Sequence, residues 1–173
     1  MSSLYEKASG SDDEWGQQMC YYKLNVACKC CSSSSTVGVG IIIRDSLRLV
    51  AAVMETTILC CGDMLQIHAE AAQLGIKFAF VMGSRRLEVD LGCLDFLRLI
   101  QQGPPCLSHL GVLVDDLCGW VPKFLDLSFS FIQKSCNKTA LVLTTEAASS
   151  ISLQVWLEDQ PSCISLLVQA DVL

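Results

Sequence analysis

Hydrophobic and polar residues follow two different spacings along residues 21–150, and these spacings predict strands and helices in turn. Runs that are rich in β-branched residues, or that alternate apolar with polar positions, predict strands at 21–28, 36–45, 48–56, 85–91 and 125–133. Apolar residues spaced three or four apart predict helices at 66–80, 93–103, 110–121 and 137–150. Three strands precede the first helix, and the order indicates a layered domain of the α/β or α+β class.

One carboxylate lies within the predicted helix 66–80. Apolar residues form a single helical stripe there, and Glu70 falls on the same stripe, between Ile67 and Leu74. A carboxylate on a buried face is costly unless its charge is compensated. Glu70 is therefore a candidate catalytic acid or metal ligand. The alternative is a glutamate in the first helical turn, stabilised by the helix dipole.

The ends of the chain differ from its centre. Residues 1–20 are acidic and polar, which predicts a disordered N-terminal tail, and residues 151–173 form a mixed C-terminal tail around a domain at 21–150. No stretch approaches the roughly 18 apolar residues of a membrane span. The acidic start is also unlike a signal peptide. We therefore expect an intracellular protein without membrane association, either nuclear or cytoplasmic.

Charge and cysteine content narrow the function classes. The net charge is −6, of which residues 1–14 and 151–173 carry −3 each, so the neutral centre gives no simple coulombic attraction to nucleic acid. The chain has 11 cysteines, an odd number that predicts mainly free thiols. Cys28 and Cys31 have the spacing of a zinc-ligand pair but lack a matching second pair. Gly38 and Gly40 lie inside a predicted strand, which argues against a dinucleotide-binding turn.

Five sequence blocks occur in a fixed order between residues 21 and 150: YKLNVA, VGVGIIIRDSLRLVAA, HAEAA, LEVDLGCLDFLRLI and SFSFIQKSCNKTALVL. Together they resemble the plant, retroelement-derived ribonuclease H-like domain of the reverse-transcriptase-like family. The resemblance implies a five-stranded mixed sheet whose first three strands are antiparallel, with helices on both faces. The hairpin RDSLRLV lacks the glycine that this family usually has there, so its turn must differ.

The resemblance also implies a site. Active members of that family cut RNA–DNA hybrids with two Mg²⁺ ions held by four carboxylates. The corresponding residues here are Ala27, Glu70, Gly92 and Leu141, so that only Glu70 retains a carboxylate. Asp90 lies two residues before Gly92 on the same strand face. Asp90 thus lies about 6.6 Å from the Gly92 position along the strand, which is far compared with a metal–oxygen distance of about 2.1 Å. Only a shift in the strand register would bring Asp90 to the position of the missing ligand.

Basic residues near the last predicted strand and helix are candidate nucleic-acid contacts. They are Lys134, Lys138 and the intervening Asn137, which is also the expected N-cap of the helix 137–150; the alternative for the lysines is solvated charge. Three functions stay open. The chain is a ribonuclease H-like domain that binds RNA–DNA hybrid or RNA without cleaving it, an active Mg²⁺-dependent hybrid ribonuclease, or an interaction module or decayed remnant with no nucleic-acid role. The first accounts for both the preserved blocks and the lost ligands.

Overall fold

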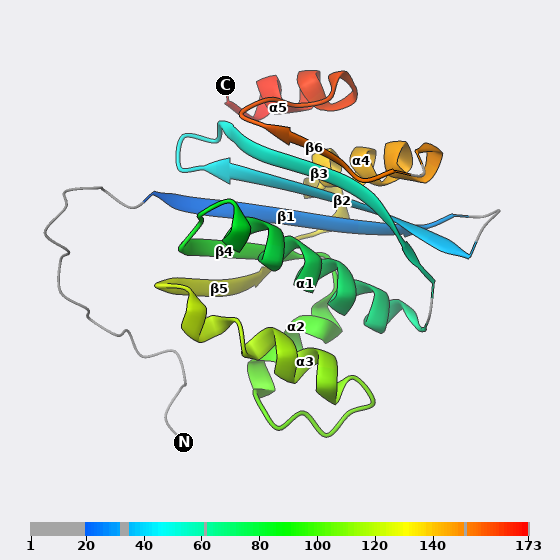
Figure 1. Ribbon diagram of the computed structural model, residues 1–173, viewed down its shortest axis with the longest axis vertical. Coiled ribbons are helices and arrows are strands. Elements are labelled where there is room, and N and C mark those ends of the chain that lie inside the picture. The colour runs from blue at the N-terminus through cyan, green and yellow to red at the C-terminus, as the bar shows by residue number, and fades with distance from the viewer. Residues whose placement is uncertain (1–19, 32–34, 61, 151, 173) are drawn as a thin grey trace, which may run out of the picture.

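The computed structural model describes residues 20–31, 35–60, 62–150 and 152–172, so the predicted N-terminal tail lies almost wholly outside the described residues (Figure 1). The described strands are β1 (Tyr21–Cys30), β2 (Thr36–Asp45), β3 (Val50–Leu59), β4 (Arg86–Leu91), β5 (Asp126–Phe131) and β6 (Gln154–Leu157). The α-helices are α1 (Met64–Val81), α2 (Leu94–Gln102), α3 (Gly111–Cys118), α4 (Lys138–Ser149) and α5 (Ser165–Val172). Short 3₁₀ turns are η1 (Val121–Lys123), η2 (Lys134–Cys136) and η3 (Ser162–Ile164). None of the described helices is long and apolar enough to cross a membrane.

All six strands form one mixed sheet in the order β5-β4-β1-β2-β3-β6. The strand β2 pairs antiparallel with both β1 and β3, as predicted, whereas β4 pairs parallel with β1 and β5 pairs parallel with β4. Helices cover both faces: α1, α2 and α3 lie on one side and α4 and α5 on the other (Figure 1). Each predicted element from 21 to 150 is present, with ends shifted by a few residues.

The sheet has six strands where five were predicted, because the C-terminal segment joins it. The strand β6 pairs antiparallel with β3, next to the predicted end of the domain. Behind it, Ile164 is fully buried and Val168 is 6% exposed in the core on the α4 side. Asp171 forms an ion pair with Arg44 of β2. A four-residue strand has too short a pattern to be recognised in sequence, so only the pairing with β3 reveals it.

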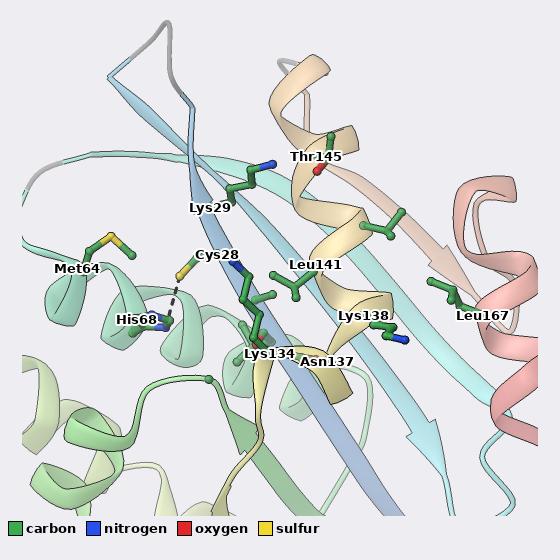
Figure 2. A pocket seen from close by; sticks show the side chains of 14 residues that line it. Cys28, Lys29, Met64, His68, Lys134, Asn137, Lys138, Leu141, Thr145 and Leu167 are labelled. Atoms are coloured by element: carbon green, nitrogen blue, oxygen red, sulfur yellow. Dashed lines mark hydrogen bonds between the residues drawn. The ribbon is translucent and has the colours of Figure 1, made fainter.

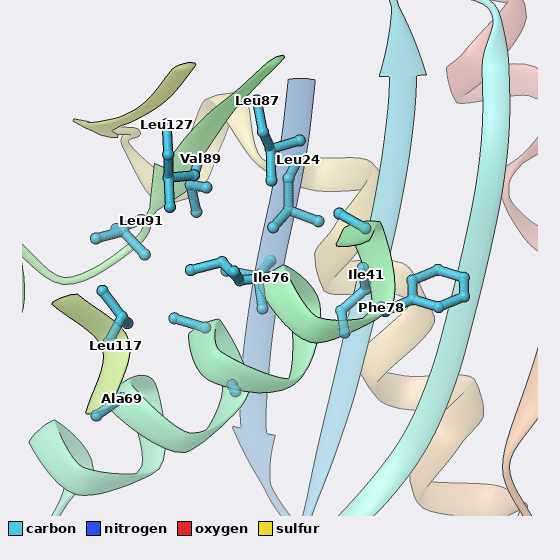
Figure 3. Packing of buried hydrophobic residues seen from close by; sticks show 14 of the residues in the cluster. Leu24, Ile41, Ala69, Ile76, Phe78, Leu87, Val89, Leu91, Leu117 and Leu127 are labelled. Atoms are coloured by element: carbon cyan, nitrogen blue, oxygen red, sulfur yellow. The ribbon is translucent and has the colours of Figure 1, made fainter. Parts of the chain in front are cut away.

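The larger core lies between the sheet and α1. Figure 3 shows Leu24, Ile41, Ile76 and Leu87 packed together in this cluster. The helix approaches closely at Gly75, where an added Cβ would lie 3.1 Å from the Leu24 side chain. The buried face of α1 contains Ile67, Ala71 and Phe78 of the predicted stripe and extends to Gly75 and Ile76.

The Gly-x-Gly pair of β2 allows α4 to lie directly on the sheet. A Cβ at Gly38 would be 2.2 Å from the carbonyl oxygen of Thr144, and one at Gly40 would be 2.3 Å from that of Ala140. Real side-chain carbons cannot approach backbone oxygens so closely. The two glycines thus serve helix packing, and they lie within a strand as the sequence indicated.

The hairpin between β2 and β3 turns without a glycine. Arg48 adopts a left-handed φ of 65°, a conformation that usually favours glycine. One oxygen of Asp45 accepts hydrogen bonds from the backbone N–H groups of Leu47 (2.8 Å) and Leu49 (2.9 Å). An aspartate side chain that bonds its own turn stabilises the loop locally. The altered turn expected from the sequence is therefore built around Asp45.

One buried carboxylate lies in β3 on the side of α4. Glu55 is opposite Gly40 in the register and only 4% exposed, and its Oε2 has no hydrogen-bond partner among the described residues. Burial, and then the charge of Glu146, raise the pKa of Glu55. The ionised form is therefore disfavoured in the folded protein.

This carboxylate predicts a pH-dependent stability. The stability that Glu55 contributes is present below the ordinary pKa of 4.5, and it is lost as the pH rises through the raised pKa of the folded state. We expect Glu55→Gln to raise the free energy of unfolding at pH 7.5 by about 0.5–2 kcal/mol, with little gain at pH 4. Urea unfolding at both pH values measures this, with the exposed Glu158→Gln as control. Equal gains at both pH values would contradict the prediction.

Candidate functional site

A cavity of about 600 Å³ lies at the end of β1, between α1 and α4 (Figure 2). Ala27 of β1, Gly92 after β4 and Leu141 of α4 all line it. These are the three positions that the resemblance matched to missing carboxylates. The floor is apolar, since Val26 and Val142 also line the cavity.

Three lysines line the same cavity. Lys134 and Lys138, predicted from sequence as nucleic-acid contacts, are joined there by Lys29 of β1. Figure 2 shows Leu141 lying between Lys29 and Lys138. Nothing in the sequence singled out Lys29, because it lies within CKCC and reaches this cavity only through the pairing of β1 in the sheet. Although the central chain is neutral overall, three of its lysines therefore line one cavity.

Asn137 joins α4 to β1. Its side chain is 4% exposed, and its Nδ2 donates a hydrogen bond of 2.9 Å to the carbonyl oxygen of Val26. The residue occupies the N-cap position of α4, as predicted, but it makes no side-chain capping bond. The predicted N-cap position is confirmed; Nδ2 bonds to β1, and Oδ1, the atom that would cap the helix, has no hydrogen-bond partner among the described residues. Asn137 therefore fixes the edge of the cavity.

Glu70 lies outside this group. The helix α1 begins at Met64, and Asp63 is its N-cap, accepting a hydrogen bond from the backbone N–H of Gln66. Glu70 is consequently in the second turn, not the first, and the Gln66 side chain donates to it at 2.9 Å. It is partly buried and does not line the cavity. The interpretation as a first-turn glutamate is wrong, and Glu70 is not among the residues that line the cavity with Ala27, Gly92 and Leu141.

His68 occupies the place next to Gly92. A Cβ on Gly92 would lie 3.9 Å from His68 Cε1, and His68 Nδ1 lies 3.5 Å from Cys28 Sγ. Two residues along a helix correspond to a rotation of about 200°, so His68 and Glu70 cannot face the same cavity. Burial raises the pKa of Cys28 to about 12 and lowers the pKa of His68. The pair is thus a neutral thiol beside a neutral imidazole, unlike an activated cysteine nucleophile.

We expect Cys28 to react slowly with alkylating reagents. Only the thiolate reacts, and a pKa of about 12 leaves very little thiolate at pH 8. Alkylation of Cys28 by iodoacetamide should be at least about a hundredfold slower than for an ordinary thiol of pKa about 8.5. Peptide mass spectrometry over time, with the exposed Cys136 as internal reference and urea-unfolded protein as control, measures the rates. Similar rates at both residues in folded protein would contradict the prediction.

Asp90 is held away from the cavity by its own hydrogen bonds. It is 3% exposed and pairs with Asn25 in the parallel register, two residues before Ala27. Asn25 Nδ2 donates to one carboxylate oxygen at 2.8 Å and Ser130 Oγ to the other at 2.6 Å, while Lys23 Nζ lies 3.2 Å away. Both oxygens are engaged. The register shift that would let Asp90 replace the lost ligand at Gly92 does not occur.

The donor atoms of the cavity do not fit a pair of Mg²⁺ ions. Magnesium prefers carboxylate and carbonyl oxygens, and none of the described residues that line the cavity has a carboxylate. Cys28 and His68 offer sulfur and nitrogen, and the lysines repel cations. Across the described residues, no group of three or more His, Cys, Asp or Glu side chains is placed to hold a metal ion. The chemistry of two-metal hydrolysis is therefore not supported by these side chains.

The sequence matches the family described as reverse transcriptase-like over residues 23–147. The chain belongs to this family. No curated protein matches the sequence. The family assignment agrees with the order of the five sequence blocks and with the sheet topology.

Solved structures resemble the fold of this reverse transcriptase-like chain. Ribonuclease H1 from the archaeon Halobacterium salinarum is 16% identical, with a TM-score of 0.62, covering 75% of this chain and 98% of that one. LC11-ribonuclease H1 in complex with RNA/DNA hybrid is also 16% identical, with a TM-score of 0.63 over 74% and 96% of the two chains. The N-terminal ribonuclease H domain of a Mycobacterium tuberculosis protein is 14% identical, with a TM-score of 0.62 over 75% and 94%. The fold is thus that of ribonuclease H, an α+β sheet with helices on both faces.

Proposed function

We propose that this chain is a ribonuclease H-like domain that binds nucleic acid and does not cleave it by the metal-dependent route. One observation carries the proposal: of the described residues that line the cavity at the site position implied by the resemblance, three are lysines and none is acidic. Lys134, Asn137 and Lys138 are the contact residues expected from sequence, and Lys29 adds a third positive charge.

The loss of cleavage follows from the chemistry that two metal ions require. Two Mg²⁺ ions activate the attacking water and stabilise the leaving oxygen of a phosphodiester, and both must be held by several oxygen ligands. Ala27, Gly92 and Leu141 offer no side-chain oxygen. Glu70, the one carboxylate kept from the family pattern, lies outside the cavity. The domain therefore retains the family's shape without its metal ligands.

The proposed partner is an RNA–DNA hybrid or RNA. LC11-ribonuclease H1 has been solved with RNA/DNA hybrid, and the foamy viral protease-reverse transcriptase with double-stranded DNA. The sequence blocks that resemble plant retroelement domains support the same class of ligand. A short RNA–DNA hybrid is consequently the first ligand to test.

Hybrid binding and hybrid cleavage test the proposal together. We expect a fluorescent RNA–DNA hybrid to bind in an anisotropy titration, with affinity falling linearly in logarithmic salt at a slope near −3 if three lysines contact phosphates. With Mg²⁺, the purified protein should release no more product than Glu70→Ala. Product above that control would instead show an active ribonuclease. No binding to hybrid or RNA at low salt would overturn the proposal in favour of an interaction module.

A further inference from the structure

We propose that Lys29, Lys134 and Lys138 each contact a phosphate of the nucleic acid along the cavity, beside the place where the resemblance implies the Mg²⁺ ions of active family members. Binding by this chain then needs no divalent metal. This inference rests on the proposed function and specifies how the bound strand is recognised.

The first argument is the charge of the cavity. Three lysines and no acidic residue are among the described residues that line it, whereas the resemblance implies four carboxylates at this place in active family members. The ion pairs of the described residues involve other cations, namely Lys23, Arg44 and Arg98, and His109 contacts Asp63. The charges of the three cavity lysines are therefore not neutralised by carboxylates in the described part of the chain. A cavity of this sign attracts an anion and repels Mg²⁺.

The second argument is the space that the lost ligands leave. Ala27 and Gly92 have the two smallest side chains, and a Cβ added to Gly92 would meet only His68 Cε1 within 4 Å. The space beside Ala27 and Gly92 is thus open, and it belongs to the cavity that the three lysines line. A phosphate oxygen can approach there without meeting a carboxylate.

The third argument is the apolar floor. Val26, Leu141 and Val142 surround the open volume with hydrocarbon, and such a surface lowers the local dielectric constant. An ammonium–phosphate attraction is stronger beside this floor than on a fully hydrated surface. The hydrogen bonds from ammonium to phosphate oxygen are charge-assisted, and lysine commonly binds phosphate as a point charge. Cys28 and His68 also line the cavity. Both are neutral, so they do not repel the phosphate.

Metal dependence separates this inference from the proposed function. Binding of a fluorescent RNA–DNA hybrid to the full chain is measured at constant ionic strength, once in EDTA and once in 5 mM Mg²⁺. We expect the affinity in EDTA to equal or exceed that in Mg²⁺. Tight binding in Mg²⁺ that disappears in EDTA would overturn the inference and leave the proposed function intact. Absence of binding in both buffers would overturn both.

Charge variants test the three lysines. The combined variant Lys29→Gln, Lys134→Gln and Lys138→Gln should bind hybrid at least about tenfold more weakly in EDTA, with the salt slope smaller in magnitude by about 3. Lys77→Gln, at an exposed lysine of α1 outside the cavity, is the matched control and should bind like wild type. All four lysines are exposed, and circular dichroism checks that each variant is folded. Wild-type affinity and salt slope in the triple variant would overturn the inference while hybrid binding itself stands.

A carboxylate returned to the cavity gives an independent test. Gly92→Asp places a negative charge in the open volume beside the lysines, so it should weaken hybrid binding in EDTA by about tenfold. Gly92→Asn, with nearly the same size and no charge, fills the same volume without repelling phosphate, so it should weaken hybrid binding clearly less than Gly92→Asp does. If the two variants bind equally in EDTA, charge in the cavity does not govern binding and the inference fails.

Discussion

Replacing Gly40 by alanine should lower the free energy of unfolding by about 2–3 kcal/mol, a large loss for one added methyl group. The new Cβ would lie 2.3 Å from the carbonyl oxygen of Ala140 and 2.6 Å from Leu143 Cβ. The first of these neighbours is backbone and cannot rotate away, so α4 as a whole must move outward from β2. Urea unfolding at constant pH measures the loss.

Gly92→Ala is the matched control for this substitution. Its Cβ meets one atom, at 3.9 Å, and we expect a change within about 0.5 kcal/mol. Because Lys138 and Leu141 belong to α4, an outward shift of the helix should also weaken hybrid binding in Gly40→Ala but not in Gly92→Ala. If the two variants are equally stable, α4 does not pack on β2 as described.

Replacing Ile164 by alanine should cost about 3 kcal/mol, because a fully buried side chain leaves a cavity when it is shortened. Ile164 packs in one cluster with Ile42 and Val53 of the sheet and Leu143 of α4. The residue lies in the segment that the sequence predicted as a tail. Urea unfolding, followed by circular dichroism, measures the change.

Leu166 provides the control within the same segment. Its side chain is 81% exposed, so Leu166→Ala should change stability by less than about 0.5 kcal/mol. A difference between the two variants means that residues 152–172 belong to the cooperative unit. Equal, small effects would show that the C-terminal segment folds apart from the core and that the domain ends near residue 150.

The two stability predictions and the lysine cavity share one structural cause, the position of α4. The helix contributes Lys138 and Leu141 to the cavity, and Asn137 at its start bonds to Val26 of β1. The close packing of α4 on the sheet depends on Gly38 and Gly40. The cavity therefore exists because two strand glycines let α4 come close to β1 and β2.

The sequence by itself determined the order of strands and helices, because local periodicity reflects which faces are buried. It also determined that Ala27, Gly92 and Leu141, the positions matched by the resemblance, have no carboxylate in any conformation. The end of α2 was also determined by a nearby residue, because Gly103 ends the helix with a φ of 72°. These features depend on residues near one another in the chain, so a single sequence contains them.

Only the tertiary structure decided which side chains share the cavity. The rotation of α1 that directs His68 rather than Glu70 toward Gly92 is set by packing of Gly75 and Ile76 on the sheet. Lys29 lines the same cavity as Lys134 and Lys138 because segments about a hundred residues apart in the chain pack together. The pairing of β6 with β3 likewise joins segments that are about a hundred residues apart. Local periodicity does not contain such long-range contacts, because they arise only when the elements pack together.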